Sequence, residues 1–172
     1  MKTAKEISII SVFTALLIGG QLALSAVSGI EIVTALTVSF FYKFSVKRSL
    51  IVATAFSLLR CFIFGFFPNV VILYLIYYNL LAVIFGSLGK AFNKKVEIKS
   101  IIVVTITAVL CTALFTVIDN VISLIYFGLS KNAFIIYYKA SLLTMIPQLI
   151  CVGISVPITF YPLVKIYEKI NV

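Results

Sequence analysis

Seven polar side chains interrupt the long apolar runs of this chain, and together they could bind a small polar solute. They comprise two carboxylates, two cations and three amides: Glu31, Asp119, Arg60, Lys139, Gln21, Asn79 and Asn120. Ionisable groups within a membrane are costly, and they usually face a cavity or a charged partner. Polar groups that converge from several helices, with aromatic side chains nearby, are typical of a ligand pocket. We therefore predict that these residues line a substrate-binding site.

Structural roles are the alternative for each of these residues. Arg60 with Asp119 or Glu31 could form a buried ion pair that only fixes the register of the helices. Lys139 could be a snorkelling anchor at the membrane surface. For most of the tyrosines near these positions we favour an aromatic belt over ligand contact. They are Tyr74, Tyr77, Tyr78, Tyr126, Tyr137 and Tyr138.

The sequence indicates neither catalysis nor a bound metal or cofactor. It contains no histidine, the usual general base and the commonest metal ligand. Cys61, Cys111 and Cys151 each lie inside an apolar run without metal-ligand spacing, so we expect them to be packing residues. The motifs His-Glu-x-x-His and Gly-x-Ser-x-Gly are absent, as is the Gly-x-x-x-x-Gly-Lys loop that binds ATP. We therefore expect a protein that is not an enzyme and that depends on other subunits for energy.

Composition places the chain in a lipid bilayer. Hydrophobic residues make up 63% and charged residues 11% of its 172 residues, whereas about a quarter of residues are charged in soluble proteins. A net charge of +9 would favour nucleic acid in a soluble protein. Here the Lys and Arg residues fall in short loops between apolar runs, so we expect no nucleic-acid partner. The length allows one transmembrane domain, residues 1–172.

Charged residues, Gly and Pro divide the chain into six predicted helices, which would form an all-α membrane bundle. Their ranges are 7–27, 30–43, 46–64, 69–91, 98–127 and 134–167. The second is short for a span, and the sixth is longer than a bilayer needs. In the sixth we expect a kink at Pro147 or Pro157, or an extension beyond the membrane. The fifth carries a polar stripe that we expect to face protein or water: Thr105, Thr112, Thr116, Asp119 and Ser123.

The basic residues predict the orientation of this bundle. With six spans, most of the 14 Lys and Arg residues fall on one side: Lys2, Lys5, Lys43, Lys47, Arg48, Lys90, Lys94, Lys95, Lys99, Lys165 and Lys169. Lys131 and Lys139 fall on the other side, and Arg60 lies within a span. By the positive-inside rule, both termini are then cytoplasmic. The strongest polar groups lie in the outer half of the membrane, which favours capture of a solute from outside.

Small residues repeat every four positions along the first predicted helix: Ser11, Ala15, Gly19 and Ala23. This spacing places them in one strip on the helix surface. In lipid, helices associate through close packing of small residues, so we predict that this strip docks a partner helix. The alternative is that the strip packs inside the protein's own bundle.

The layout and the strip resemble the substrate-binding S components of prokaryotic energy-coupling factor (ECF) vitamin transporters. The most local match is Ala15-Leu-Leu-Ile-Gly19, where glycine replaces the second alanine of the family's Ala-x-x-x-Ala motif. The resemblance implies a multi-pass protein of the prokaryotic cell membrane whose first helix docks on a membrane T subunit carrying two ATPase subunits. It also implies a ligand in the outer half of the bundle. Candidates for that pocket are Gln21, Glu31, Arg60, Asn79, Asp119 and Asn120.

No signature in the sequence identifies a particular vitamin. Charges of both signs beside Tyr and Phe side chains would suit a small polar or zwitterionic heterocycle. A second hypothesis is a non-transporting membrane scaffold similar to the small cell-shape protein MreD. In that case the polar residues would be structural, and the strip on the first helix would bind a different partner.

Overall fold

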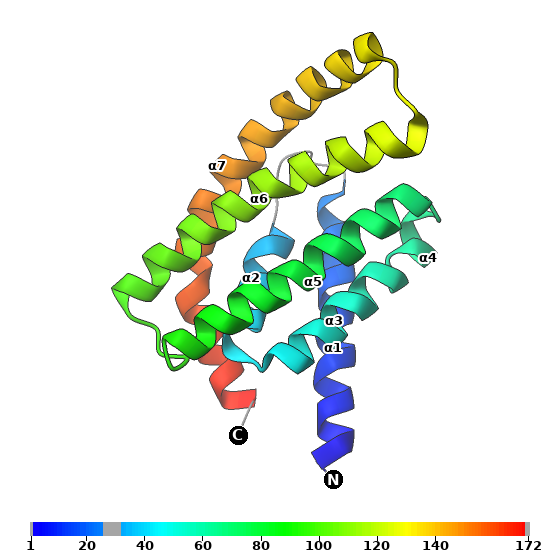
Figure 1. Ribbon diagram of the computed structural model, residues 1–172. Coiled ribbons are helices and arrows are strands. Elements are labelled where there is room, and N and C mark those ends of the chain that lie inside the picture. Colours follow the sequence, from blue (N-terminus) through cyan, green and yellow to red (C-terminus); the bar gives the residue numbers. More distant parts are fainter. Residues whose placement is uncertain (1, 26–31, 171–172) are drawn as a thin grey trace.

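The computed structural model describes residues 2–25 and 32–170, and this part of the chain contains helices and no strands, as predicted (Figure 1). The helices are α1 (Lys2–Leu24), α2 (Ile32–Lys43), α3 (Val46–Leu59), α4 (Cys61–Phe64), α5 (Pro68–Ala91), α6 (Ile98–Phe127) and α7 (Lys131–Ile170). By length and composition α1, α5, α6 and α7 could each cross a membrane, whereas α2 is a shorter apolar helix. The fold is therefore an all-helical bundle compatible with a membrane.

Two helices depart notably from their predicted ranges, and one of these departures lies at the candidate site. The predicted 46–64 helix is interrupted at Arg60, which separates α3 from the single turn of α4. Gly65 then adopts a φ of 90°, a left-handed conformation that glycine reaches without a steric cost. At the other end of the chain, α1 begins at Lys2 and not at residue 7, because Lys, Ala and Glu favour helix.

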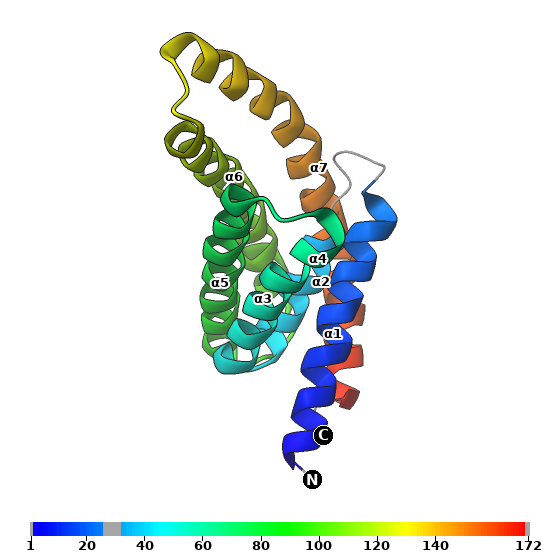
Figure 2. The same cartoon turned by 90° about the vertical axis from the view of Figure 1, so that its right-hand side faces the viewer.

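The last helix is much longer than a membrane requires. α7 has 40 residues, or about 60 Å at 1.5 Å per residue, against a hydrocarbon core of about 30 Å. Pro147, Pro157 and Pro162 lie inside it without ending it, and Figure 2 shows that it bends along its length. The predicted last helix therefore forms, and it is longer than predicted, from residue 131 to residue 170.

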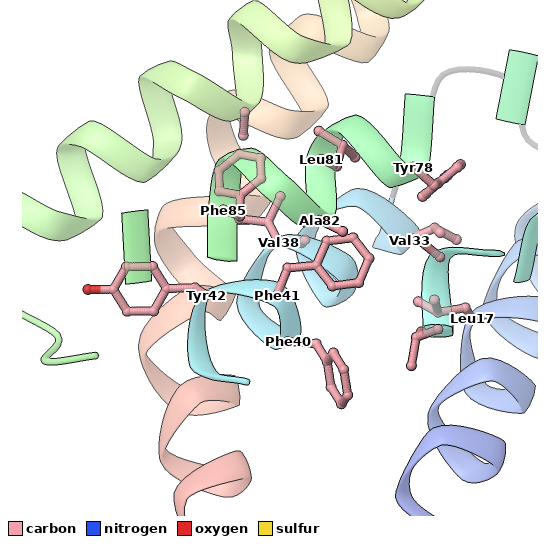
Figure 3. Close-up of a cluster of buried hydrophobic side chains, with 14 of the residues drawn as sticks. Leu17, Val33, Val38, Phe40, Phe41, Tyr42, Tyr78, Leu81, Ala82 and Phe85 are labelled. Carbon is pink, nitrogen blue, oxygen red and sulfur yellow. The ribbon is translucent and has the colours of Figure 1, made fainter. Parts of the chain in front are cut away.

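The short helix α2 lies at the centre of the bundle. Nine of its 12 residues are buried, and it packs against α1, α5 and α7. Figure 3 shows Phe40 and Phe41 of α2 among side chains of α1 and α5, including Leu17 and Phe85. Helices that bury most of their sides are surrounded by protein, so α2 lies at the centre of the hydrophobic core.

Two glycines allow α5 to approach the end of α2 and the start of α3 closely. A Cβ atom added at Gly89 would collide with the backbone carbonyl of Tyr42, and one at Gly86 would lie 2.7 Å from Cγ2 of Val46. The Tyr42 hydroxyl also donates a hydrogen bond of 2.6 Å to the carbonyl of Lys95, just beyond α5. Because Gly89 has no side chain, the backbones of α2 and α5 can lie in direct contact.

The bundle has two different ends. α1 begins and α7 ends at one of them (Figure 1), as expected for an even number of membrane crossings. Basic residues concentrate there: Lys43 forms an ion pair of 2.8 Å with Glu168, and burial together with the charges of Lys43, Arg48 and Lys90 lowers the pKa of Lys94. We call this the basic end. The opposite end contains most of the predicted site residues.

Candidate solute-binding site and docking face

The first polar cluster joins α1, the junction of α3 with α4, and α5. Nε of Arg60 donates to Oε1 of Gln21 over 3.2 Å, and Nε2 of Gln21 donates to the hydroxyl of Tyr74 over 2.9 Å. The Arg60 guanidinium lies 4.1 Å from the ring centroid of Tyr74 and 4.9 Å from that of Phe64. All four side chains are half-buried. The structure therefore brings Gln21 and Arg60 together, and we call this group the Arg60 cluster.

The interruption of α3 explains this geometry. Arg60 lies where α3 gives way to α4, so the next turn supplies Phe64 beside the guanidinium. Gly65 ends that turn, and Pro68 starts α5 at a position where proline is well tolerated. This short connection brings Tyr74 of α5 next to Arg60.

The second polar cluster joins α6 to α7. The Tyr137 hydroxyl donates to Oδ2 of Asp119 over 2.8 Å and lies 3.1 Å from Oγ of Ser123. One turn deeper, Nδ2 of Asn120 donates to Oγ of Ser141 over 2.9 Å. Asp119 and Asn120 thus both bond to side chains of α7, and we call this group the Asp119 cluster. Ser123, Thr112 and Thr116 are buried, which confirms that this face of α6 points towards protein.

Removal of the Tyr137 hydroxyl tests the strength of the Asp119 cluster. Hydrogen bonds between membrane helices contribute about 0.6 kcal/mol on average and up to about 1.7 kcal/mol. We expect Tyr137→Phe to destabilise the protein by about 1 kcal/mol, because Asp119 loses its donor. Thermal unfolding in detergent measures this loss. Tyr138→Phe is the matched control, since that side chain is 43% exposed; equal unfolding temperatures for the two variants would contradict the prediction.

Aromatic side chains of α5 and α6 pack together next to the two clusters. The ring of Phe115, one turn before Asp119 on α6, lies 6.0 Å from the Tyr74 ring and 4.7 Å from the Tyr77 ring. Tyr77 and Tyr78 are buried at 3% and 6% exposure, so their predicted place in a surface belt is wrong. Phe64, Phe115 and Ser141 were not among the predicted site residues, because only the packing of distant helices brings them to the site.

The ion pair between Arg60 and Asp119 does not form. Within residues 2–25 and 32–170, ion pairs join Lys43 and Lys165 to Glu168 and Arg48 to Glu6, all near the basic end. Arg60 instead bonds to Gln21 and contacts Tyr74 and Phe64, whereas Asp119 accepts a hydrogen bond from Tyr137. Glu31, the other predicted partner, lies outside the described residues.

Two predicted site residues do not join either cluster. Asn79 accepts a hydrogen bond of 3.1 Å from Thr54 and donates one of 2.8 Å to the carbonyl of Leu75, so it links α3 to α5. Thr54 lies six residues before Arg60, so this contact is about 9 Å away from Arg60 along the helix axis. Lys139 is exposed, because two residues rotate a helical position by about 200° from Tyr137. It therefore points away from α6.

The predicted docking strip is open. Ser11, Ala15, Gly19 and Ala23 are all exposed, and a Cβ atom added at Gly19 would meet no atom within 4 Å. The side of α1 that packs inside the bundle carries other residues, including Phe13 and Leu17. The alternative in which the strip packs within the protein's own bundle is therefore wrong for the part of the chain that the structure describes.

An apolar groove of about 400 Å³ lies beside the strip, between α1, α2 and α7. Its floor includes the rings of Phe13 and Phe40, stacked with centroids 3.9 Å apart. The buried Tyr167 hydroxyl lines the groove and has no hydrogen-bond partner among the described residues. Val12 and Leu16 form the α1 wall, so strip and groove make one continuous open face, which we call the α1 face.

Comparison of the chain with protein-family models, curated proteins and solved structures finds no match. The function is therefore inferred from the geometry of the two clusters and the α1 face. The Arg60 cluster presents a cation beside two aromatic rings, and the Asp119 cluster presents carboxylate and amide groups. Such groups can bind a small polar molecule through hydrogen bonds and charge.

Proposed function

We propose that this protein is the substrate-capture subunit of an ECF-type importer. It binds a vitamin or a related small polar molecule at the end of the bundle that contains the Arg60 and Asp119 clusters. A T subunit with two ATPase subunits then drives delivery of the solute. The bundle crosses the cell membrane six times, with the basic end and both termini in the cytoplasm.

One observation carries this proposal: polar side chains gather at one end of the bundle, while the small-residue strip of α1 remains exposed. The first feature suits recognition of a solute that cannot partition into lipid. The second suits close approach of a helix from another membrane subunit, since small side chains let helix backbones come together. Gln21 lies between Gly19 and Ala23 of the strip but is half-buried and bonded to Arg60 and Tyr74. The strip and the Arg60 cluster therefore use different faces of α1, so solute binding and partner docking can occur at the same time.

The basic end supports the proposed orientation. Burial and the nearby charges of Lys43, Arg48 and Lys90 together lower the pKa of Lys94. Such a concentration of cations is retained preferentially on the cytoplasmic side of a membrane. Arg60 and Asp119, at the other end, would then be reached from outside the cell.

Mass spectrometry of small molecules retained by the protein tests this function. After purification in mild detergent, we expect a defined polar solute in a near-stoichiometric amount. We further expect Asp119→Ala to lower retention, because its carboxylate belongs to the second cluster. Recovery of lipid and detergent alone, together with no binding to a vitamin panel, would contradict the proposal.

A membrane scaffold resembling MreD is the second candidate. The observation that favours it is the Asp119 cluster, where Asp119, Asn120 and Ser123 all bond to side chains of α7. This arrangement would also suit a purely structural junction between two helices. Under this candidate, the purified protein retains no polar solute, and Asp119→Ala lowers only its stability.

A further inference from the structure

We propose that the solute carries a carboxylate and that Arg60 binds it. This inference rests on the proposed function and narrows the substrate class of the same site. The observation behind it is that the Arg60 guanidinium is held by three side chains while most of its donors remain unused. Only its Nε has a hydrogen-bond acceptor among the described residues, namely Gln21.

The surroundings of Arg60 fix the orientation of the guanidinium. The rings of Tyr74 and Phe64 lie 4.1 and 4.9 Å from its central carbon. Gln21 accepts from Nε and is itself held by its hydrogen bond to Tyr74. The two terminal nitrogens are therefore presented together, with four N–H donors in a plane. This geometry matches a carboxylate, which binds guanidinium through two parallel hydrogen bonds.

Charge balance favours an anion over a neutral ligand. None of the described carboxylates forms an ion pair with Arg60, since their ion pairs all lie near the basic end. The aromatic rings offset only part of the cost of holding a cation away from water. A half-buried cation near the membrane is stabilised further by a charged partner, and a carboxylate of the solute would supply that charge. The carboxylate of Asp119 does not supply it, because Asp119 forms no ion pair with Arg60 and instead accepts a hydrogen bond from Tyr137.

Matched pairs of acids and amides test this inference. The probes are nicotinate with nicotinamide, benzoate with benzamide, and biotin with its primary amide, together with any solute retained on purification. We expect the wild-type protein to retain a carboxylate-containing solute and to bind the acid of at least one pair more tightly than the amide. Arg60→Gln should weaken binding of that acid about tenfold to a hundredfold, because a charged hydrogen bond is lost, and should not change binding of the amide.

Two further variants keep the experiment decisive. Arg60→Lys keeps the positive charge but loses the paired N–H donors of the guanidinium. We therefore expect this variant to prefer the acid over the amide less strongly than the wild type does, but more strongly than Arg60→Gln. Lys131→Gln, an exposed change at the start of α7, should leave binding unaltered. A retained solute without a carboxylate, preference for the amide, or unchanged acid binding by folded Arg60→Gln would overturn this inference and leave the proposed function standing. Failure to retain or bind any solute would overturn both.

Discussion

Gly89→Ala is expected to lower the free energy of unfolding by about 1–3 kcal/mol, the usual cost of overpacking a core. The added methyl group would collide with the backbone carbonyl of Tyr42. A backbone atom cannot rotate away as a side chain does, so α2 and α5 must separate. That movement disturbs the buried centre of the bundle, including Phe41 and Phe85.

The expected loss of stability is opposite in sign to the usual effect of replacing Gly by Ala in a helix. In an isolated helix, Ala is more favourable than Gly by about 0.5–1 kcal/mol. Gly19→Ala is the matched control, because the added Cβ meets no atom within 4 Å, and we expect it to be neutral or slightly stabilising. Thermal unfolding of both variants in the same detergent measures the difference. Equal or higher stability of Gly89→Ala would show that α2 and α5 are further apart than described here.

Gly19→Leu is expected to abolish uptake of the solute by whole cells. The leucine side chain would project from the exposed strip and prevent a partner helix from approaching α1 closely. The isolated protein should bind its solute as tightly as the wild type, since Gly19 contacts neither cluster. Uptake of the radiolabelled solute and equilibrium binding to purified protein measure the two properties separately.

Gly19→Ala serves again as the control, because alanine keeps the side chains of the strip small. We expect it to retain transport. Parallel loss of transport and binding in Gly19→Leu would mean that the substitution disturbs the fold. Full transport by this variant would mean that the strip is not a docking surface.

Sequence patterns predicted the features that depend on local periodicity. Thr112, Thr116 and Ser123 of α6 are buried together because a helix repeats about every 3.6 residues. The same regularity placed Ser11 and Gly19 on one exposed strip of α1. Charge distribution also indicated the concentration of Lys43, Arg48 and Lys90 at one end of the bundle.

Features that depend on packing between distant helices were not predictable in this way. The sequence prediction treated α2 only as a helix that is short for a membrane span. In the structure, most of its residues are buried and other helices pack around it. It also grouped Arg60 with Asp119, although Arg60 bonds to Gln21 and Asp119 bonds to Tyr137. Approximate depth in a membrane locates a polar residue along one axis only. Asn79 and Lys139 were therefore predicted as site residues, although Asn79 bonds to Thr54 and Lys139 is exposed.

We propose that α1 offers an open face to an ATP-driven transport module and that the end of the bundle opposite the basic end binds solute. Affinity purification of the full chain from native membranes at its natural expression level, followed by identification of the bound proteins, tests this claim most directly. We predict recovery of a membrane T subunit and ATPase subunits with the wild type, and their loss with Gly19→Leu. Recovery of cell-wall elongation proteins without any ATPase subunit would contradict it.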